Sequence, residues 1–188
     1  MLEVLGSDAV DQCPFIFVTA MTHAAIEAIF GKIKSLMVKY RALKDYDPTW
    51  LDHIHLERVL VGSTHKAPTE RGIYIYAGTT FQLYKFCDKT NIKANMIIID
   101  EAGQLALGTA ALAIRWLSER GKLVLAGDHE QLAPILSASY PDSKLKPIFG
   151  SILDMVMGQE GLEIAETALN SQESNFDRPV VQLLENFR

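Results

Sequence analysis

Short apolar runs alternate with amphipathic segments along most of this chain. Five of these runs have the length of buried strands, and they do not alternate between polar and apolar positions. They are Pro14–Thr19, Leu56–Gly62, Ile73–Gly78, Met96–Ile99 and Lys122–Ala126. Strands that are apolar on both sides are typical of a parallel sheet with helices on both faces.

Helical patterns fill the spaces between these strands. The first covers residues 22–39, with Thr22 as a candidate N-cap. Apolar residues recur there at helical spacing, at Ala25, Ile29, Ile33 and Leu36. Further helices are expected over residues 79–87, 105–120 and 151–157. Residues 45–55 are expected to form a loop or a short irregular helix, and the weakly patterned segment 161–178 a mobile loop. The sequence therefore predicts one α/β domain of three layers.

The length and composition fit this prediction. A chain of 188 residues can bury the core of one domain, and its net charge of −5 gives no overall attraction to nucleic acid, although a local basic surface remains compatible with it. The two cysteines, Cys13 and Cys87, lack the spacing of a zinc site, so we expect reduced thiols in an intracellular protein, cytoplasmic or nuclear. No secretory signal begins the chain and no apolar run approaches the ~20 residues of a membrane span, so no membrane is expected.

One strand ends in two adjacent acids. In MIIIDEAGQL, residues 96–105, Asp100 and Glu101 directly follow the apolar run. Ligands of such sheets bind beyond the carboxyl ends of the strands. One carboxylate there suits Mg²⁺, and a second can act as general base toward a water molecule. The simpler alternative is that both acids cap the next helix.

The next strand is also followed by polar and acidic residues. In LVLAGDHEQLAPIL, residues 123–136, Gly127 permits a tight turn, and Asp128 is expected beside the strand that carries Asp100. The amide of Gln131 could position a water molecule or contact a terminal phosphate. Taken alone, a residue such as His129 or Gln131 is more often structural than catalytic. Two neighbouring strands that both end in acidic and polar residues, with one helix between them, are harder to explain as helix caps alone.

These two segments resemble motifs II and III of superfamily 1 helicases. The resemblance is closest to the branch of the nonsense-mediated-decay RNA helicase and the DNA-replication helicase-nuclease. Other segments fit the same family in order: FIFVTAMTHAAIEAI resembles motif Ia, RVLVGS and YAGTTFQL its next two strands, FGSILDMVM the helix after motif III, and LLENFR motif IV. The resemblance implies that residues 1–188 are part of the first RecA-like motor domain of an ATP-dependent helicase.

The resemblance also implies roles for individual residues. Asp100 would bind Mg²⁺ through the nucleotide phosphates, and Glu101 would activate the attacking water. Gln131 would sense the γ-phosphate of ATP, and Arg188 would neutralise charge on the transferred phosphoryl group. Three residues would lie along the surface that binds single-stranded RNA or DNA: Thr22, His23 and Thr80.

One family motif is missing from the sequence. There is no GxxxxGK[ST] phosphate loop, because the Gly-Lys pairs at Gly31-Lys32 and Gly121-Lys122 are not followed by Ser or Thr. We therefore expect a domain truncated at its N-terminal P-loop unit, with a second RecA-like domain in the longer protein. The isolated chain is expected to bind ATP weakly and to hydrolyse it negligibly.

Two other functional hypotheses stay open. The chain could be a non-catalytic interaction module derived from a helicase domain, which the missing phosphate loop favours. It could also be a metal-dependent hydrolase whose ligands are Asp100, Glu101, Asp128 and His129.

Overall fold

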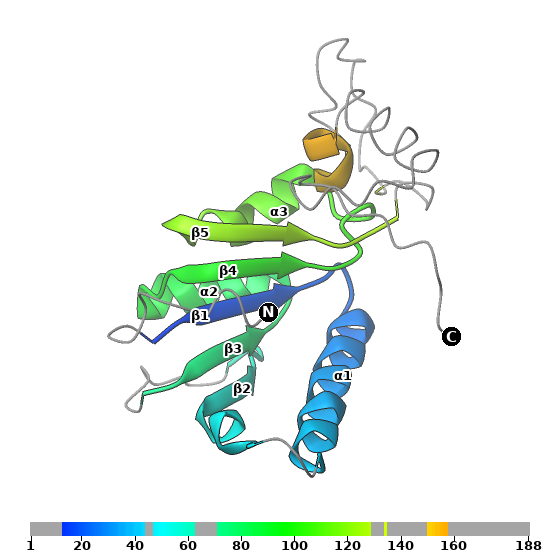
Figure 1. Cartoon of the computed structure of the whole chain (residues 1–188). Coiled ribbons are helices and arrows are strands. Elements are labelled where there is room, and N and C mark those ends of the chain that lie inside the picture. The colour runs from blue at the N-terminus through cyan, green and yellow to red at the C-terminus, as the bar shows by residue number, and fades with distance from the viewer. Residues whose placement is uncertain (1–12, 44–46, 63–70, 129–133, 135–149, 158–188) are drawn as a thin grey trace.

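The domain is built on one sheet of five parallel strands. The computed structural model describes residues 13–43, 47–62, 71–128, 134 and 150–157. The strands are β1 (Phe15–Thr19), β2 (Ile54–Arg58), β3 (Ile73–Ala77), β4 (Ala94–Ile99) and β5 (Leu117–Leu125). Their order in the sheet is β2-β3-β1-β4-β5, and every neighbouring pair is parallel (Figure 1). The predicted α/β class is confirmed, and the arrangement is consistent with a RecA-like fold.

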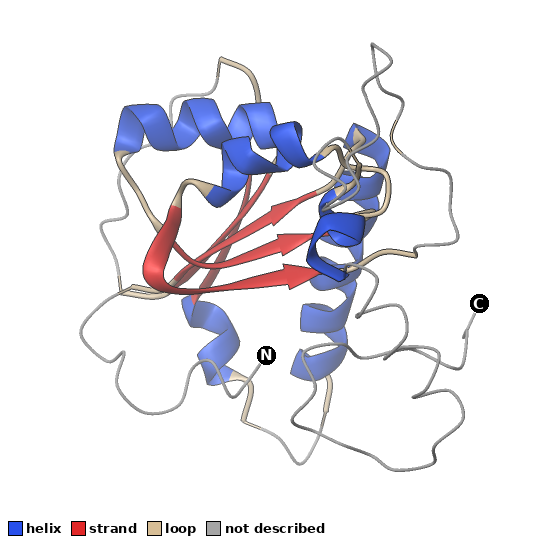
Figure 2. Cartoon of the chain, turned by 90° about the horizontal axis from the view of Figure 1, so that it is seen from above, coloured by secondary structure: helices blue, strands red, loops and turns tan. Residues whose placement is uncertain are grey.

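Helices cover both faces of the sheet (Figure 2). They are α1 (His23–Arg41), α2 (Thr80–Thr90), α3 (Leu107–Ile114), the short 3-10 helix η2 (Thr49–His53) and a helix over residues 152–157. Side chains alternate across each strand, so Phe17 packs into the core on the side of α2 and α3, while Ile16 and Val18 pack against α1. The predicted three-layer arrangement is confirmed.

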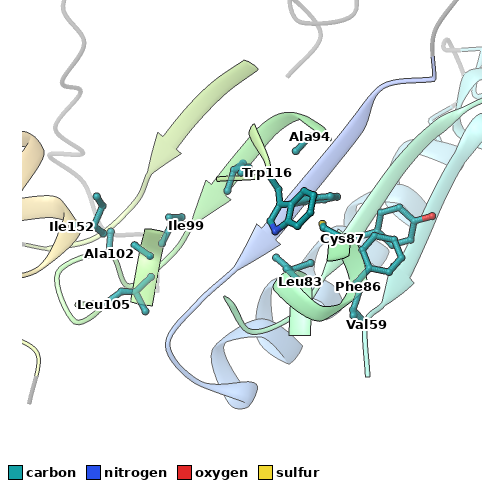
Figure 3. Close-up of a cluster of buried hydrophobic side chains, with 14 of the residues drawn as sticks. Val59, Leu83, Phe86, Cys87, Ala94, Ile99, Ala102, Leu105, Trp116 and Ile152 are labelled. Atoms are coloured by element: carbon teal, nitrogen blue, oxygen red, sulfur yellow. The ribbon is translucent and has the colours of Figure 1, made fainter. Parts of the chain in front are cut away.

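The larger core lies between the sheet and the helices α2 and α3. Phe17, Tyr76 and Phe86 form its aromatic centre, with ring centroids 4.6 Å apart for Tyr76 and Phe86 and 6.3 Å for Phe17 and Phe86. Figure 3 shows Ile152 and Ala102 at one side of this core, Val59 and Phe86 at the other, and Trp116 between them. The same cluster therefore supports the sheet from its amino edge to its carboxyl edge.

Two helices begin where the sequence predicts. Thr22 caps α1, with its Oγ1 accepting the N–H of Ala25 at 3.1 Å. Thr79 caps α2 in a capping box: its Oγ1 accepts the N–H of Gln82 at 3.3 Å, and Gln82 Oε1 accepts the N–H of Thr79 at 2.9 Å. These local hydrogen bonds fix the points where the chain leaves β1 and β3.

Several boundaries differ from the sequence prediction. The helix expected over 105–120 ends at Ile114, because the chain turns at Trp116 and joins β4 from Leu117 onward. The N–H of Ala94 donates to the Trp116 carbonyl at 2.8 Å, and the pairing of β4 with β5 then shifts register between Ala94 and Met96. The second strand is Ile54–Arg58 instead of the predicted Leu56–Gly62, and the fifth begins at Leu117 instead of Lys122. The segment expected to be mobile, 161–178, lies outside the described residues.

Helix length and hydropathy bear on membrane insertion. Within the described part of the chain, no helix combines the length and the apolar character needed to cross a bilayer.

Candidate functional site

Three strand ends are joined beyond the sheet proper, at its carboxyl edge. The N–H of Asp100 donates to the Thr19 carbonyl at 2.9 Å, which links the end of β4 to the end of β1. The N–H of Ala126 donates to the Ile99 carbonyl at 2.8 Å, and the N–H of Ala102 donates back to the Ala126 carbonyl at 2.9 Å. The residues after β4 and β5 are therefore held firmly in relation to each other.

The loops after β4 and β5 touch through two glycines. A Cβ atom on Gly103 would lie 2.6 Å from the Asp128 carbonyl oxygen, and one on Gly127 would lie 3.0 Å from the backbone nitrogens of Ala102 and Gly103. No other residue fits such a backbone approach without displacement. Asp128 thereby lies beside the loop that follows β4, and the sequence predicted it beside the strand that carries Asp100.

Glu101 has a conformation that is unusual for its residue type. Its φ of 53° is in the left-handed region, and its carbonyl accepts the N–H of Gln104 at 2.9 Å to close a turn. Such a backbone costs a non-glycine residue roughly 1–2 kcal/mol. Its side-chain atom Oε2 is buried and has no hydrogen-bond partner in the structure as described. Strain combined with a buried, unpartnered carboxylate oxygen is typical of a functional position.

The acid pair does not cap the following helix. Helix α3 begins at Leu107, and its N-cap is Ala106, which makes no side-chain capping bond. Asp100 and Glu101 precede this start by more than a full helical turn. The alternative in which the two acids only cap the next helix is therefore wrong.

A short helix supports both loops from behind. Residues 152–157 begin after Ser151, whose Oγ accepts the N–H of Asp154 at 3.0 Å. The N–H of Ile152 donates to the Leu105 carbonyl at 2.9 Å, and Leu153 reaches the space beside both Gly103 and Gly127. The predicted helix is confirmed, and its packing holds the two loops together.

Thr19 is a site residue that the sequence analysis missed. It ends β1, is 0% exposed, and its Oγ1 has no hydrogen-bond partner among the described residues. Its carbonyl accepts the N–H of Asp100. A polar residue ending an otherwise apolar strand is the sequence signal that could have identified it.

Carboxylates are the possible metal ligands among the described residues of this edge. In the ranges that the structure describes, no group of three or more His, Cys, Asp or Glu could hold a metal ion. Mg²⁺ needs no such group, since it takes one or two protein oxygens and completes its shell with water and phosphates. Asp100, half-buried at the end of β4, fits that role. His129, a ligand in the metal-hydrolase alternative, lies outside the described residues.

Two further predicted residues are not placed. Gln131 and Arg188, expected at the γ-phosphate of ATP, both lie outside the described part of the chain. Their roles stay predictions.

The three predicted nucleic-acid residues differ in exposure. Thr22 and His23 are exposed at the start of α1. Thr80 is only 3% exposed, so its side chain packs at the start of α2 and offers no surface for a strand to contact. The expectation that the Thr80 side chain lies on the binding surface is corrected for this reason. Sequence alone could not tell which side of this helix end faces the core.

A largely buried arginine side chain, which the sequence did not single out, lies beside His23. Arg58, at the end of β2, has a side chain only 11% exposed. Its Nη1 donates to the Ala77 carbonyl at 2.7 Å, and its Nη2 lies 3.4 Å from His23 Nδ1. A guanidinium only donates, so a hydrogen bond in this contact requires Nδ1 to accept, which in a neutral ring leaves the proton on Nε2. His23 can therefore donate one hydrogen bond outward.

Comparison with known proteins adds no assignment. No protein-family model, curated protein or solved structure matches this chain significantly.

Proposed function

We propose that this chain is part of an ATP-dependent helicase or translocase that moves along single-stranded RNA or DNA. The observation that carries the proposal is the contact between the two acid-bearing loops at the carboxyl edge. There, a strained Glu101 with an unpartnered carboxylate oxygen lies next to Asp100 and close to Asp128.

The chemistry assigned to these residues is hydrolysis of the terminal phosphate bond. Asp100 would hold Mg²⁺, which offsets negative charge on the phosphates when it is bound. Glu101 accepts the proton of the attacking water, whose oxygen forms a bond to the γ-phosphorus while the bond to the β,γ-bridging oxygen breaks. Gln131 is proposed to contact the γ-phosphate, and Arg188 to neutralise its charge.

The nucleic-acid surface is proposed at the neighbouring strand ends. Thr22 and His23 follow β1, next to β4 in the sheet, so the start of α1 lies near the loop of Asp100. The Nε2–H of His23 and the exposed start of α1 supply donors for phosphate oxygens. These contacts would be made to the sugar-phosphate backbone of the single-stranded nucleic acid, without preference for RNA or DNA.

The missing phosphate loop gives the proposal its first test. The coding sequence upstream of Met1 is expected to encode a GxxxxGK[ST] segment followed by a helix. In its absence, the proposal of a motor would give way to the non-catalytic interaction module. The 188-residue chain itself should show only weak Mg-ATP binding in calorimetry. Micromolar binding with turnover would instead reveal another phosphate site.

The second test acts on Glu101 in a longer protein that carries that loop. Glu101→Gln should leave Mg-ATP affinity within about twofold and lower the hydrolysis rate by about 100-fold or more, because it removes the general base. Asp88→Asn, at an exposed acid on α2, is the matched control and should change neither quantity. Turnover of Glu101→Gln close to wild type would contradict the assignment.

Metal analysis separates the hydrolase alternative. A motor releases Mg²⁺ when no nucleotide is present, so gel-filtered protein should retain no stoichiometric metal. Retention of a transition metal that depends on Asp128 and His129 would favour the metal-dependent hydrolase.

A further inference from the structure

Helix α1 is longer than the part of the sheet that it covers. Its 19 residues span about 28 Å, whereas the five residues of β1 span about 17 Å. The residues of α1 that pack on the sheet all come from its first turns; they are Ala25, Ile26, Ile29 and Phe30. The second half of the helix therefore extends past this core.

The apolar spacing of α1 continues beyond the sheet. Ile26, Ile29, Ile33, Leu36, Tyr40 and Leu43 are separated by three and four residues in turn. This is the a and d spacing of a helix that packs against another helix. Ile26 is 0% exposed, but Leu36 and Tyr40 are each 44% exposed and Leu43 is 51% exposed. We define the α1 stripe as Ile33, Leu36, Tyr40 and Leu43.

The last member of the stripe lies just beyond the helix. The N–H of Leu43 donates to the Tyr40 carbonyl at 3.3 Å, so the chain keeps a turn after the C-cap residue Ala42. Leu43 therefore continues the spacing of the stripe by one turn. The exposed part of the α1 stripe extends for about two turns.

The surroundings of the α1 stripe are basic. Between Ala28 and Leu43 the chain has no acidic residue, although its net charge is −5. The basic residues of this segment are Lys32, Lys34, Lys39 and Arg41. Arg41 is paired with Asp52 at 2.7 Å, and the Nζ of Lys34 lies 4.5 Å from the ring centroid of Phe30.

The other two basic residues of this segment lie along one border of the α1 stripe. Lys32 and Lys39 are exposed and seven residues apart, so they lie on the same side of the helix, next to Leu36. Residues that flank an a/d stripe in this way select a partner by its charge.

We propose that the α1 stripe docks an acidic amphipathic helix of a protein partner. Leucines on that helix would pack against Leu36 and Leu43, and its carboxylates would face Lys32 and Lys39. A second copy of this chain would bring the same lysines together, which is unfavourable. Single-stranded nucleic acid would match the charge but gains little from exposed leucines. This surface is separate from the proposed nucleotide site, because α1 starts at the carboxyl edge and runs away from it.

A peptide titration with two matched variants tests the proposal. The probe is a fluorescent helical peptide of about three heptads, with leucine at a and d and glutamate at e and g. Leu36→Gln should weaken its binding to the 188-residue chain by about tenfold, the effect of losing one apolar anchor. Val38→Gln is the control: Val38 is 68% exposed but lies on another side of α1, so this variant should bind like wild type. Circular dichroism checks that both variants keep their helix content.

A charge exchange tests the lysines separately. The double variant Lys32→Glu/Lys39→Glu should no longer bind the acidic peptide. It should instead bind a matched peptide that has lysine at e and g. Equal affinities for Leu36→Gln and Val38→Gln, or an unchanged preference after the exchange, would overturn the proposal. So would binding to anionic phosphatidylserine vesicles without binding to the peptide, which indicates a membrane surface. A dimer in sedimentation that Leu36→Gln dissociates would indicate a second copy instead.

Discussion

Arg58 donates from Nε to Glu27 Oε1 over 2.7 Å and thereby joins the end of β2 to the first turns of α1. The same guanidinium donates to the Ala77 carbonyl at 2.7 Å, so three elements meet at one side chain. Arg58 is 11% exposed whereas Glu27 is 60% exposed, so the arginine carries most of the desolvation. Nη2 of the same guanidinium lies 3.4 Å from His23 Nδ1.

Replacement of Arg58 should weaken the fold. Arg58→Met removes the hydrogen bonds to Glu27 and Ala77, and we expect the free energy of unfolding to fall by about 1–3 kcal/mol. Lys85→Met, at an exposed position of α2, is the control and should change it by less than about 0.5 kcal/mol. Urea denaturation followed by circular dichroism measures both. Equal effects of the two substitutions would show that the Arg58 contacts add nothing to stability.

Glu101 should be unfavourable for stability. Glycine adopts its left-handed backbone freely and removes the buried oxygen without a partner, so Glu101→Gly should raise the free energy of unfolding by about 1 kcal/mol. Glu119→Gly, at an exposed position of β5, should lower it by about 0.5–1 kcal/mol. Chemical denaturation of the two variants gives the comparison. Destabilisation of both to the same extent would mean that Glu101 stores no strain.

The contact between the two loops predicts a pair of opposite alanine effects. A Cβ atom on Gly103 would meet the Asp128 carbonyl at 2.6 Å, so Gly103→Ala should destabilise the domain by about 1–3 kcal/mol. Gly108, within α3, has nothing within 4 Å of such an atom, and Gly108→Ala should stabilise by up to about 1 kcal/mol. Melting curves of both variants test the pair. Similar shifts in Tm would show that the loops separate easily.

Cys87 should make stability sensitive to alkaline pH. Burial raises the pKa of its thiol to about 12, whereas an unfolded thiol titrates near about 8.5. Below the unfolded pKa the thiol is neutral in both states and has no pH effect. Between these values only the unfolded state loses the proton, so the free energy of unfolding falls as pH rises, by at most about 1.4 kcal/mol per pH unit.

The Cys87→Ala variant isolates this contribution. Burial also raises the pKa of Tyr76, which acts in the same direction above its ordinary value. Urea denaturation from pH 8 to 10.5 should therefore show a shallower decline for Cys87→Ala than for wild type. Parallel declines would show that the thiol ionises equally well in both states.

Much of the layered architecture was determined by the sequence alone. Continuous apolar runs such as Pro14–Thr19 and Ile73–Gly78 predicted buried parallel strands, because only a sheet covered on both faces buries every side chain of a strand. The helix starts at Thr22 and Thr79 were also predictable, since a capping residue and the amide that it accepts are only three residues apart.

Only the tertiary structure decided the rest. Residues 115–120 fit a helical pattern, but pairing with β4 begins a strand at Leu117, because hydrogen bonds to a distant segment outweigh local periodicity. The burial of Thr80 and of Arg58, the unpartnered Thr19 hydroxyl and the contact between Gly103 and Asp128 each depend on segments far apart in sequence. Residue type and spacing named the acids at the strand ends. Whether those acids share one edge is a matter of strand order, which is set by packing across the whole sheet and not by any single stretch of the chain.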